Sequence, residues 1–148
     1  MIPAMVLTVA LVAVCVLVHY EVLRVTSDLL PRLTIRPRPR ILFVMGAAFL
    51  AHTAEVWVFA VAYYILGDHF GIGSLVGERT NTFPDYLYFS TVTYTSLGFG
   101  DVYPIGGLRL VAGVESLLGL VMIAWTGSFT YLAMQRFWEL HGRPGSRK

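Results

Sequence analysis

Residues 91–104, TVTYTSLGFGDVYP, combine hydroxyl side chains with two glycines in a chain that is otherwise strongly apolar. Gly98 and Gly100 stand at alternate positions, where a backbone can turn its carbonyl groups to one side without a steric penalty from Cβ. Non-helical backbone at membrane depth is tolerated only where protein buries it or where it lines a water-filled path. Carbonyl oxygens gathered in this way can replace the water shell of a cation. The stretch therefore predicts a cation site made of main-chain oxygens.

The residues just before this stretch predict a short helix that leads into it. Pro84 and Asp85 suit a helix start, because the missing N–H costs nothing there and a carboxylate complements the helix dipole. About three turns of aromatic and hydroxyl residues follow, too few to cross a bilayer. A short helix followed by an extended strand indicates a re-entrant loop. One strand offers oxygens from one side only, so a complete cage requires several copies of the chain around an axis.

Composition places this loop in a membrane protein. Of the 148 residues, 56% are hydrophobic and only 14% are charged, which is far more apolar than a soluble domain of this size. Three segments are long enough to span a bilayer: about 2–23, 41–66 and 108–137. The first is interpreted as a retained span, because its basic residues follow the apolar stretch. The single cysteine, Cys15, excludes an intrachain disulfide and a cysteine-based metal site.

The basic residues predict how the chain is oriented. Nine of the eleven lysines and arginines fall in two places, between the first two apolar segments and at the end of the third: Arg24, Arg32, Arg36, Arg38, Arg40, Arg136, Arg143, Arg147 and Lys148. Basic residues near span ends stay cytoplasmic. We therefore expect the N-terminus and residues 67–107 outside, and the C-terminus in the cytoplasm. Pro31, Pro37 and Pro39 are expected to keep the loop between the first two spans from continuing either helix.

The motif resembles the filter signature of the potassium channel pore family, above all the bacterial two-transmembrane channels. Thr93-Tyr94-Thr95-Ser96-Leu97-Gly98-Phe99-Gly100-Asp101 is similar to Thr-x-x-Thr-x-Gly-Tyr-Gly-Asp, and the resemblance extends over about 41–137. It implies an all-α tetrameric membrane channel with a re-entrant pore helix and a selectivity filter, and the first apolar segment adds an extra N-terminal helix outside the usual pore module, which makes three transmembrane helices. The expected division is an N-terminal helix 1–27, a basic cytoplasmic loop 28–40, and a pore module 41–137 followed by a tail 138–148. Within the pore module we expect an outer helix 41–66, a turret 67–82, a pore helix 83–95, a filter 96–101 and an inner helix 107–137.

The resemblance also implies roles for individual residues. Potassium would be held by main-chain carbonyls of the filter, with the Ser96 hydroxyl at its inner end: Ser96, Leu97, Gly98, Phe99 and Gly100. Thr95 and Asp101 would support the filter, and Gly119 falls where the family often has a hinge glycine. The inner mouth would be formed by Ile123, Gly127, Tyr131 and Gln135, and four copies of Tyr131 or of Gln135 would narrow the cytoplasmic entrance.

Four positions depart from the family pattern. Ser96 stands for the usual Thr, Leu97 for Val and Phe99 for Tyr, while Val92 occupies the place where some relatives carry a Glu that braces the Asp after the filter. These changes predict a less firmly supported filter, with potassium selectivity kept and the stability of the conducting state altered.

Three ionisable residues lie inside predicted spans, where charges are costly and usually functional: His52, Glu55 and Glu115. By helical rise the two carboxyl groups reach nearly the same depth, so they could meet behind the pore helix, near Thr91, Thr93 and Tyr94. One interpretation is that they brace the filter and make gating respond to pH. The other is a hydrogen-bond network that joins helices in one protonation state. His19 is explained by snorkelling toward the cytoplasmic interface.

The sequence thus favours a potassium-selective channel in the cell (inner) membrane that passes ions without a cofactor. The expected partners are three further copies of the chain, potassium and membrane lipid, and no nucleic acid. Nothing in the sequence predicts an enzyme. Two alternatives stay open: a weakly selective cation channel, and a non-conducting membrane subunit that keeps the pore fold.

Overall fold

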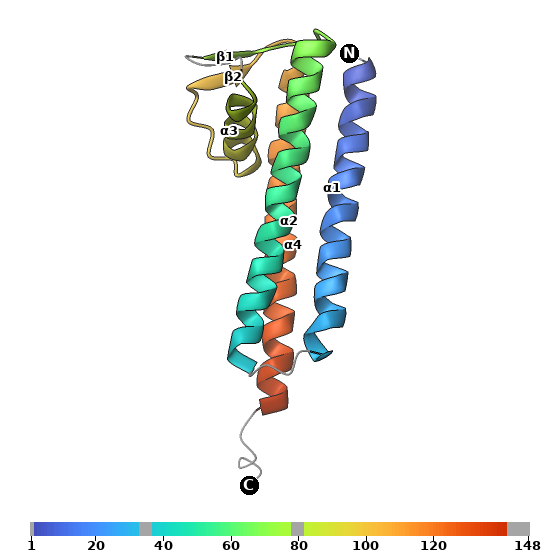
Figure 1. Cartoon of the computed structure of the whole chain (residues 1–148), viewed down its shortest axis with the longest axis vertical. Helices are drawn as coiled ribbons and strands as arrows, with labels where there is room; N and C mark the ends of the chain where they lie inside the picture. The colour runs from blue at the N-terminus through green and yellow to red at the C-terminus, as the bar shows by residue number, and fades with distance from the viewer. Residues whose placement is uncertain (1, 33–36, 78–81, 142–148) are drawn as a thin grey trace.

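The computed structural model describes residues 2–32, 37–77 and 82–141. Of the described elements, three long helices run side by side along the molecule, and a short helix with two short strands lies beside one end of them (Figure 1). The N-terminus is at that same end, while the C-terminal end of the last helix is at the opposite one. The elements are, in order, α1 (Ile2–Leu29), η1 (Leu30–Arg32), α2 (Pro37–Tyr64), η2 (Ile65–His69), β1 (Leu75–Gly77), α3 (Phe83–Tyr94), β2 (Val102–Pro104) and α4 (Leu108–His141).

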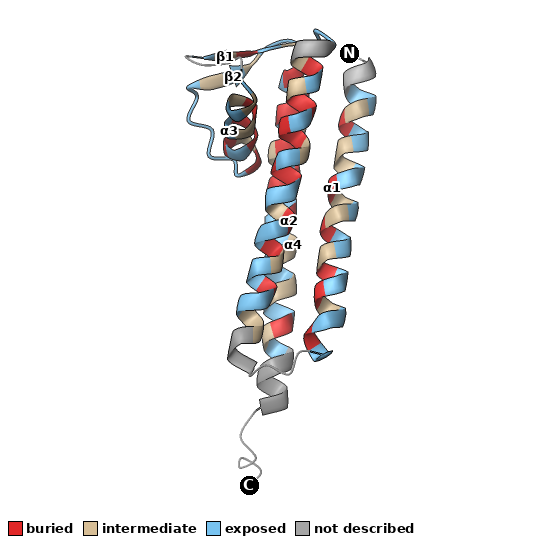
Figure 2. Cartoon of the chain, in the orientation of Figure 1, coloured by how far each residue is buried: buried red, intermediate tan, exposed pale blue. Residues whose placement is uncertain are grey.

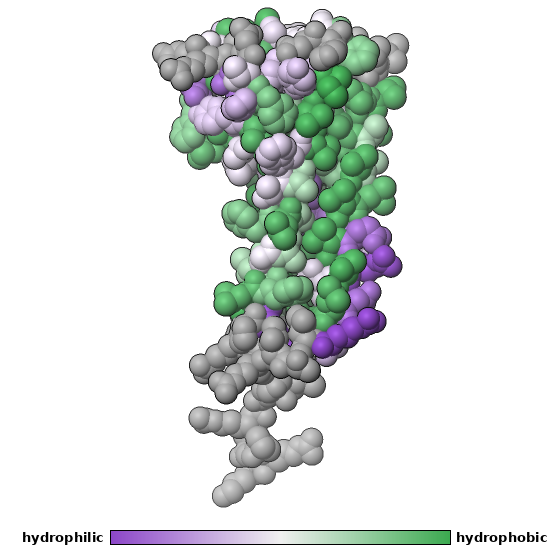
Figure 3. Space-filling model, in the orientation of Figure 1, coloured by the Kyte–Doolittle hydropathy of each residue, from purple (hydrophilic) through white to green (hydrophobic). Residues whose placement is uncertain are grey.

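Three of these helices are long and apolar enough to cross a membrane: Met5–Arg32, Arg40–Gly67 and Leu108–Gln135. Figure 2 shows buried residues along the inward faces of the helices and exposed ones along the outward faces. The outward side of α1 is largely apolar, with hydrophilic side chains gathered toward its C-terminal end (Figure 3). An apolar outer surface of this kind suits lipid rather than water.

The connection between α1 and α2 differs from the predicted loop 28–40. α1 continues to Leu29, a 3-10 turn follows to Arg32, and α2 begins at Pro37. Pro37 and Pro39 therefore stand in the first turn of a helix, where the N–H that proline lacks would have no intrahelical partner. The expectation that these two prolines lie outside the helix was wrong.

The predicted turret 67–82 contains more structure than a loop. α2 ends in a π-helical turn, Ile65–His69, and the chain then forms β1, which pairs antiparallel with β2 in the register Leu75 with Pro104 and Gly77 with Val102. A Cβ on Gly73 would lie 2.2 Å from the carbonyl oxygen of Ile105, so the backbones approach too closely for any side chain there. This pairing joins the segment that precedes α3 to the segment that follows the filter segment (residues 96–101).

The start of α3 forms as its sequence predicts. The Asp85 carboxylate accepts hydrogen bonds from the backbone N–H of Thr82, at 3.1 Å, and from its hydroxyl, at 2.7 Å. Pro84 stands in the first turn, where its fixed φ is already helical. Because α3 packs against both α2 and α4, this start fixes where its other end, at Tyr94, meets the long helices.

The core lies where α3 meets the three long helices. Its buried members come from every helix and include Cys15, Phe59, Tyr63, Tyr94 and Met122. The α1 helix packs against both α2 and α4, so it is part of this core.

Candidate functional site

The filter segment has a backbone that alternates in handedness. Among described non-glycine residues only Ser96 has a positive φ, of 58°, and it is followed by Gly98 at 49° and Gly100 at 81°. Leu97 and Phe99 between them therefore have negative φ. Such a conformation is free of Cβ strain for glycine but costly for serine, so the surrounding contacts must hold Ser96 in it.

Hydrogen bonds from the filter segment to the end of α3 fix the direction of its peptide groups. The N–H of Ser96 donates to the carbonyl of Thr93 at 2.9 Å, and the N–H groups of Leu97 and Gly98 both donate to the carbonyl of Val92, at 2.9 and 3.1 Å. No cis peptide is present in the described chain. In a trans peptide the C=O points opposite to the N–H. The carbonyls of Thr95, Ser96 and Leu97 therefore point away from α3, all toward one side.

These carbonyls are free to accept a ligand within the single chain. Residues 95–100 are all exposed, and no described donor hydrogen-bonds to the carbonyls of Thr95, Ser96 or Leu97. The Ser96 hydroxyl lies 2.9 Å from the hydroxyl of Ser116 on α4, which anchors the inner end of the segment. The arrangement offers oxygens along one side of a strand and none from the other side.

The outer end of the filter segment is held by a residue that sequence reasoning missed. The Tyr88 hydroxyl donates to the Asp101 carboxylate at 2.7 Å. This hydrogen bond raises the pKa of Tyr88 above its ordinary value of 10.0. Tyr88 lies one helical turn before Val92, which is buried and offers no polar group. The brace that Val92 cannot provide comes from the same helix, and the i, i+4 spacing is the signal that could have found it.

Behind α3, five side chains form a closed ring of hydrogen bonds, named here the polar ring: His19, His52, Glu55, Tyr94 and Thr126. His19 Nδ1 lies 2.8 Å from Glu55 Oε1, and the Tyr94 hydroxyl donates to Glu55 Oε2. The same hydroxyl lies 2.8 Å from His52 Nδ1. The Thr126 hydroxyl closes the ring, at 3.0 Å from His52 Nε2 and 3.1 Å from His19 Nε2. The ring joins α1, α2, α3 and α4.

His19 corrects the expectation that it snorkels to the interface. Its side chain is fully buried, and its ring lies 5.2 Å from that of Trp125, centroid to centroid. The α1 face that carries His19 packs against α2 and α4, so the imidazole points inward rather than along the helix. The N-terminal helix thus contributes a polar group to the centre of the molecule.

Glu115 belongs to a second polar cluster, beside the first. Tyr63 donates to Glu115 Oε2 at 2.5 Å, and Ser90 lies 2.5 Å from Glu115 Oε1. The Ser90 hydroxyl is also 2.9 Å from the carbonyl of Val56. The sequence suggested that Glu55 and Glu115 meet behind the pore helix, but the structure has no bond between them. Glu55 instead contacts α3 through Tyr94, and Glu115 contacts it through Ser90. Thr91 takes no part, because its hydroxyl donates to the carbonyl of Leu87 within α3.

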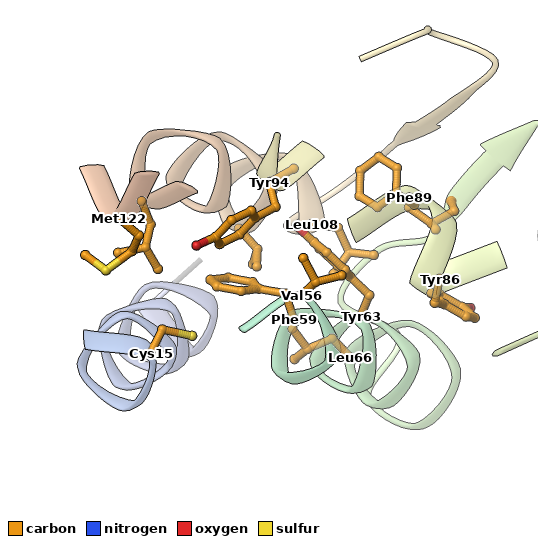
Figure 4. Close-up of a cluster of buried hydrophobic side chains, with 14 residues drawn as sticks. Cys15, Val56, Phe59, Tyr63, Leu66, Tyr86, Phe89, Tyr94, Leu108 and Met122 are labelled. Carbon is orange, nitrogen blue, oxygen red and sulfur yellow. The ribbon is translucent and has the colours of Figure 1, made fainter. Parts of the chain in front are cut away.

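The place where α3 ends against α4 requires Gly119. A Cβ on Gly119 would lie 1.9 Å from the carbonyl oxygen of Tyr94, so only glycine fits. α4 is continuous through this position. Figure 4 shows Tyr94 pointing into the space between the long helices, near Met122 and Cys15.

The predicted inner-mouth residues share one exposed face of α4. Ile123, Gly127, Tyr131 and Gln135 are all exposed, at the i, i+4 spacing of a single stripe. The first three also line a groove of about 450 Å³ between α2 and α4, together with His52 and Thr126 of the polar ring.

Comparison with known proteins identifies the class of protein. A family model described as "Ion channel" matches residues 51–136, which is more than half of the chain. The chain belongs to this ion channel family, so it is a channel protein rather than an enzyme, and its three apolar helices make it a multi-pass membrane protein.

Individual relatives are similar over parts of the chain. Protein LctB of Geobacillus stearothermophilus is 42% identical over 72 residues, which cover 45% of this chain and 54% of LctB. A putative potassium channel protein of Rhodopseudomonas palustris is 39% identical over 57 residues, or 38% of this chain and 14% of that protein. The inward rectifier potassium channel Kirbac3.1 of Paramagnetospirillum magnetotacticum is 31% identical over 80 residues, or 53% of this chain and 25% of that channel. The resemblance to the potassium channel pore family is confirmed, while the matched segment spans about half or less of each relative.

Proposed function

We propose that four copies of this chain surround one pore, and that the pore conducts potassium passively through the carbonyls of Ser96, Leu97, Gly98 and Phe99. The observation that carries the proposal is the run of free carbonyls at Thr95, Ser96 and Leu97, which point to one side, away from α3. A dehydrated cation needs oxygens all around it, and symmetry-related copies of one strand supply them.

Selectivity for potassium is supported by two relatives whose names describe potassium channels. The departures at Ser96, Leu97 and Phe99 leave the main-chain oxygens unchanged, because those positions contribute carbonyls whatever their side chains. The hydrogen bond from Tyr88 to Asp101 supports the outer end of the filter. A weakly selective cation channel is the second candidate, favoured by the strained, unbranched Ser96 at the inner end.

We also propose the orientation that the arginines predict, with the N-terminus outside and the C-terminus in the cytoplasm of a cell (inner) membrane. In that orientation the α3 end of the molecule faces outside. A thiol probe that cannot cross membranes should label a Ser74→Cys variant in a Cys15→Ala background in intact cells. Labelling only after the cells are opened would contradict the orientation.

Potassium flux from liposomes that contain only this protein tests conduction. The sharpest variant is Gly98→Ala, since alanine is disfavoured at a φ of 49°. The matched control is Gly46→Ala on α2, where a Cβ meets nothing within 4 Å. We expect Gly98→Ala to lower the flux at least tenfold and Gly46→Ala to leave it unchanged. A wild-type protein without flux would support a non-conducting subunit, and equal sodium and potassium flux would support the weakly selective channel.

The tetramer is tested separately by the mass of the purified protein in a mild detergent. Four chains per particle is the expected result. A monomer would contradict the proposal, because one strand cannot enclose an ion.

A further inference from the structure

The polar ring has as many contacts as members, and this allows its protons to be counted. Each of its five contacts joins two nitrogen or oxygen atoms and needs one hydrogen between them. The hydroxyls of Tyr94 and Thr126 supply one hydrogen each. Two neutral imidazoles supply one each, and an ionised Glu55 supplies none. That state fills only four contacts and leaves two acceptors facing each other.

One further proton completes the ring. If Glu55 is a carboxylic acid, or if His19 or His52 is an imidazolium opposite the carboxylate, the hydrogens match the contacts and the ring has no net charge. A second extra proton would place two hydrogens in one contact. Because an uncompensated charge or an unfilled contact is costly in a buried site inside a membrane, the neutral state is strongly favoured.

We propose that the polar ring keeps this extra proton, is electrically neutral, and is the device through which the N-terminal helix α1 holds the end of the pore helix beside the filter. His19 is the only member from α1, and Tyr94 is the last residue of α3. Tyr94 is followed within two residues by Ser96, where the filter begins. The role for α1 rests on the proposed function, whereas the proton count does not.

His19, His52 and Glu55 also have the spacing of metal ligands, but the structure bonds them to one another and to Tyr94 and Thr126. Ligand atoms of His19, His52 and Glu55 lie within 4.8 Å of one another. Each of these atoms already takes part in a hydrogen bond of the ring, so a metal ion would have to displace protons and break the link to Tyr94.

Other titratable groups near the ring have their own partners or no charge to contribute. Glu115 is bonded to Tyr63 and, through Ser90, to α3, and the described structure has no hydrogen bond from it to a member of the ring. Cys15 is buried on α1 in the apolar core that also contains Tyr94. Arg24 and Glu21 pair with each other at the exposed surface of α1. The proton balance of the ring is therefore set by its own members.

The proton count predicts how stability depends on pH. Opened to water above about pH 6.5, the five side chains hold four protons, because both histidines are neutral and the carboxyl group is ionised. The closed ring holds five, so unfolding releases one proton. Stability then falls as pH rises, by about tenfold in the folding equilibrium constant per pH unit. Between about pH 4.3 and 6.5 the opened groups hold six protons, so stability rises with pH there.

The variant Glu55→Gln isolates this effect. Its amide supplies one hydrogen toward His19 and its carbonyl accepts from Tyr94, so all contacts are filled without a titratable proton. Above about pH 6.5 neither the folded nor the unfolded variant changes its protonation in the ring. Titratable groups elsewhere are the same in both proteins, so they cancel in the comparison.

Unfolding by sodium dodecyl sulfate in mixed micelles, at pH 6.5, 7.5 and 8.5, measures both proteins. We expect the folding equilibrium constant of the wild type, divided by that of Glu55→Gln, to fall about tenfold for each pH unit. Equal slopes would overturn the proton count. A Thr26→Val variant is the control for a buried polar group on α1, since the Thr26 hydroxyl donates to the carbonyl of Val22 in its own helix and bonds to no other described residue. It should keep the wild-type slope.

The link to the filter is tested with Tyr94→Phe. His52 Nδ1 lies 3.5 Å from Glu55 Oε2, so the four remaining groups can close a smaller ring that still holds one extra proton. We expect Tyr94→Phe to keep the wild-type pH slope but to change potassium flux or its selectivity over sodium by at least threefold. Unchanged flux and selectivity would overturn the role proposed for α1. If wild-type protein conducts nothing, the proposed function fails while the slopes still test the ring.

Discussion

The Tyr88 hydroxyl donates a 2.7 Å hydrogen bond to the Asp101 carboxylate, and this bond connects α3 to the outer end of the filter segment. The inner end is connected to the same helix, through the carbonyls of Val92 and Thr93. A helix of twelve residues therefore holds both ends of the strand that carries the exposed carbonyls.

Tyr88→Phe is expected to shorten the time for which the filter stays conducting, without unfolding the chain. The ring of Tyr88 stays in place and only the bond to Asp101 is lost. Decay of potassium current after opening is the measurement. A decay identical to that of the wild type would show that the filter does not depend on this bond.

The same pair makes a pH prediction whose sign follows from the pKa of Tyr88. Because the hydrogen bond to Asp101 raises this pKa above 10.0, the Tyr88 hydroxyl keeps its proton up to about pH 10, and the bond is lost as pH rises through the raised value. The difference in current decay between wild type and Tyr88→Phe should therefore be the same at every pH between 6 and 9. A difference between wild type and Tyr88→Phe that disappears within that range would contradict this.

Gly119→Ala is expected to lower the free energy of unfolding by about 2 kcal/mol or more, because its Cβ would overlap the Tyr94 carbonyl and force α3 away from α4. Gly113→Ala on the same helix is the matched control, since its Cβ meets nothing within 4 Å. It should leave stability unchanged or raise it by about 1 kcal/mol. Thermal unfolding in detergent measures both, and equal effects would contradict the close contact.

Glu115→Gln is expected to be tolerated, whereas Glu115→Leu is not. Ser90 has one hydroxyl hydrogen but bonds both the Val56 carbonyl and Glu115, so the second bond needs a proton on Glu115. An amide can supply that hydrogen and still accept from Tyr63. Leucine would leave the buried Tyr63 hydroxyl without its acceptor, at a cost of about 1–3 kcal/mol. Thermal unfolding measures the stability of both variants. A loss of stability in Glu115→Gln as large as that in Glu115→Leu would contradict the prediction.

Local signals in the sequence were enough to place the parts of the fold that depend on neighbouring residues. Pro84 and Asp85 mark the start of α3, and the long apolar segments mark the three long helices. Gly98 and Gly100 indicate backbone that leaves the helical conformation, and both have positive φ.

Contacts between distant segments could not be predicted in the same way. The pairing of β1 with β2 joins two strands of three residues, too short to show a pattern of their own. The bond between His19 and Glu55 depends on how α1 is rotated against α2, which hydropathy does not specify. A faint signal was present, because the polar or small residues of α1 at Thr8, Cys15, His19 and Thr26 are all buried on its packed side.

The central claim is that carbonyls of the filter segment bind a monovalent cation together with those of neighbouring copies. Anomalous diffraction from thallium, a heavy substitute for potassium, tests it most directly in crystals of the intact protein. We expect thallium peaks on an axis shared by four chains, within coordinating distance of the carbonyl oxygens of Ser96, Leu97, Gly98 and Phe99. Peaks elsewhere, or filter carbonyls that face no common axis, would contradict the account.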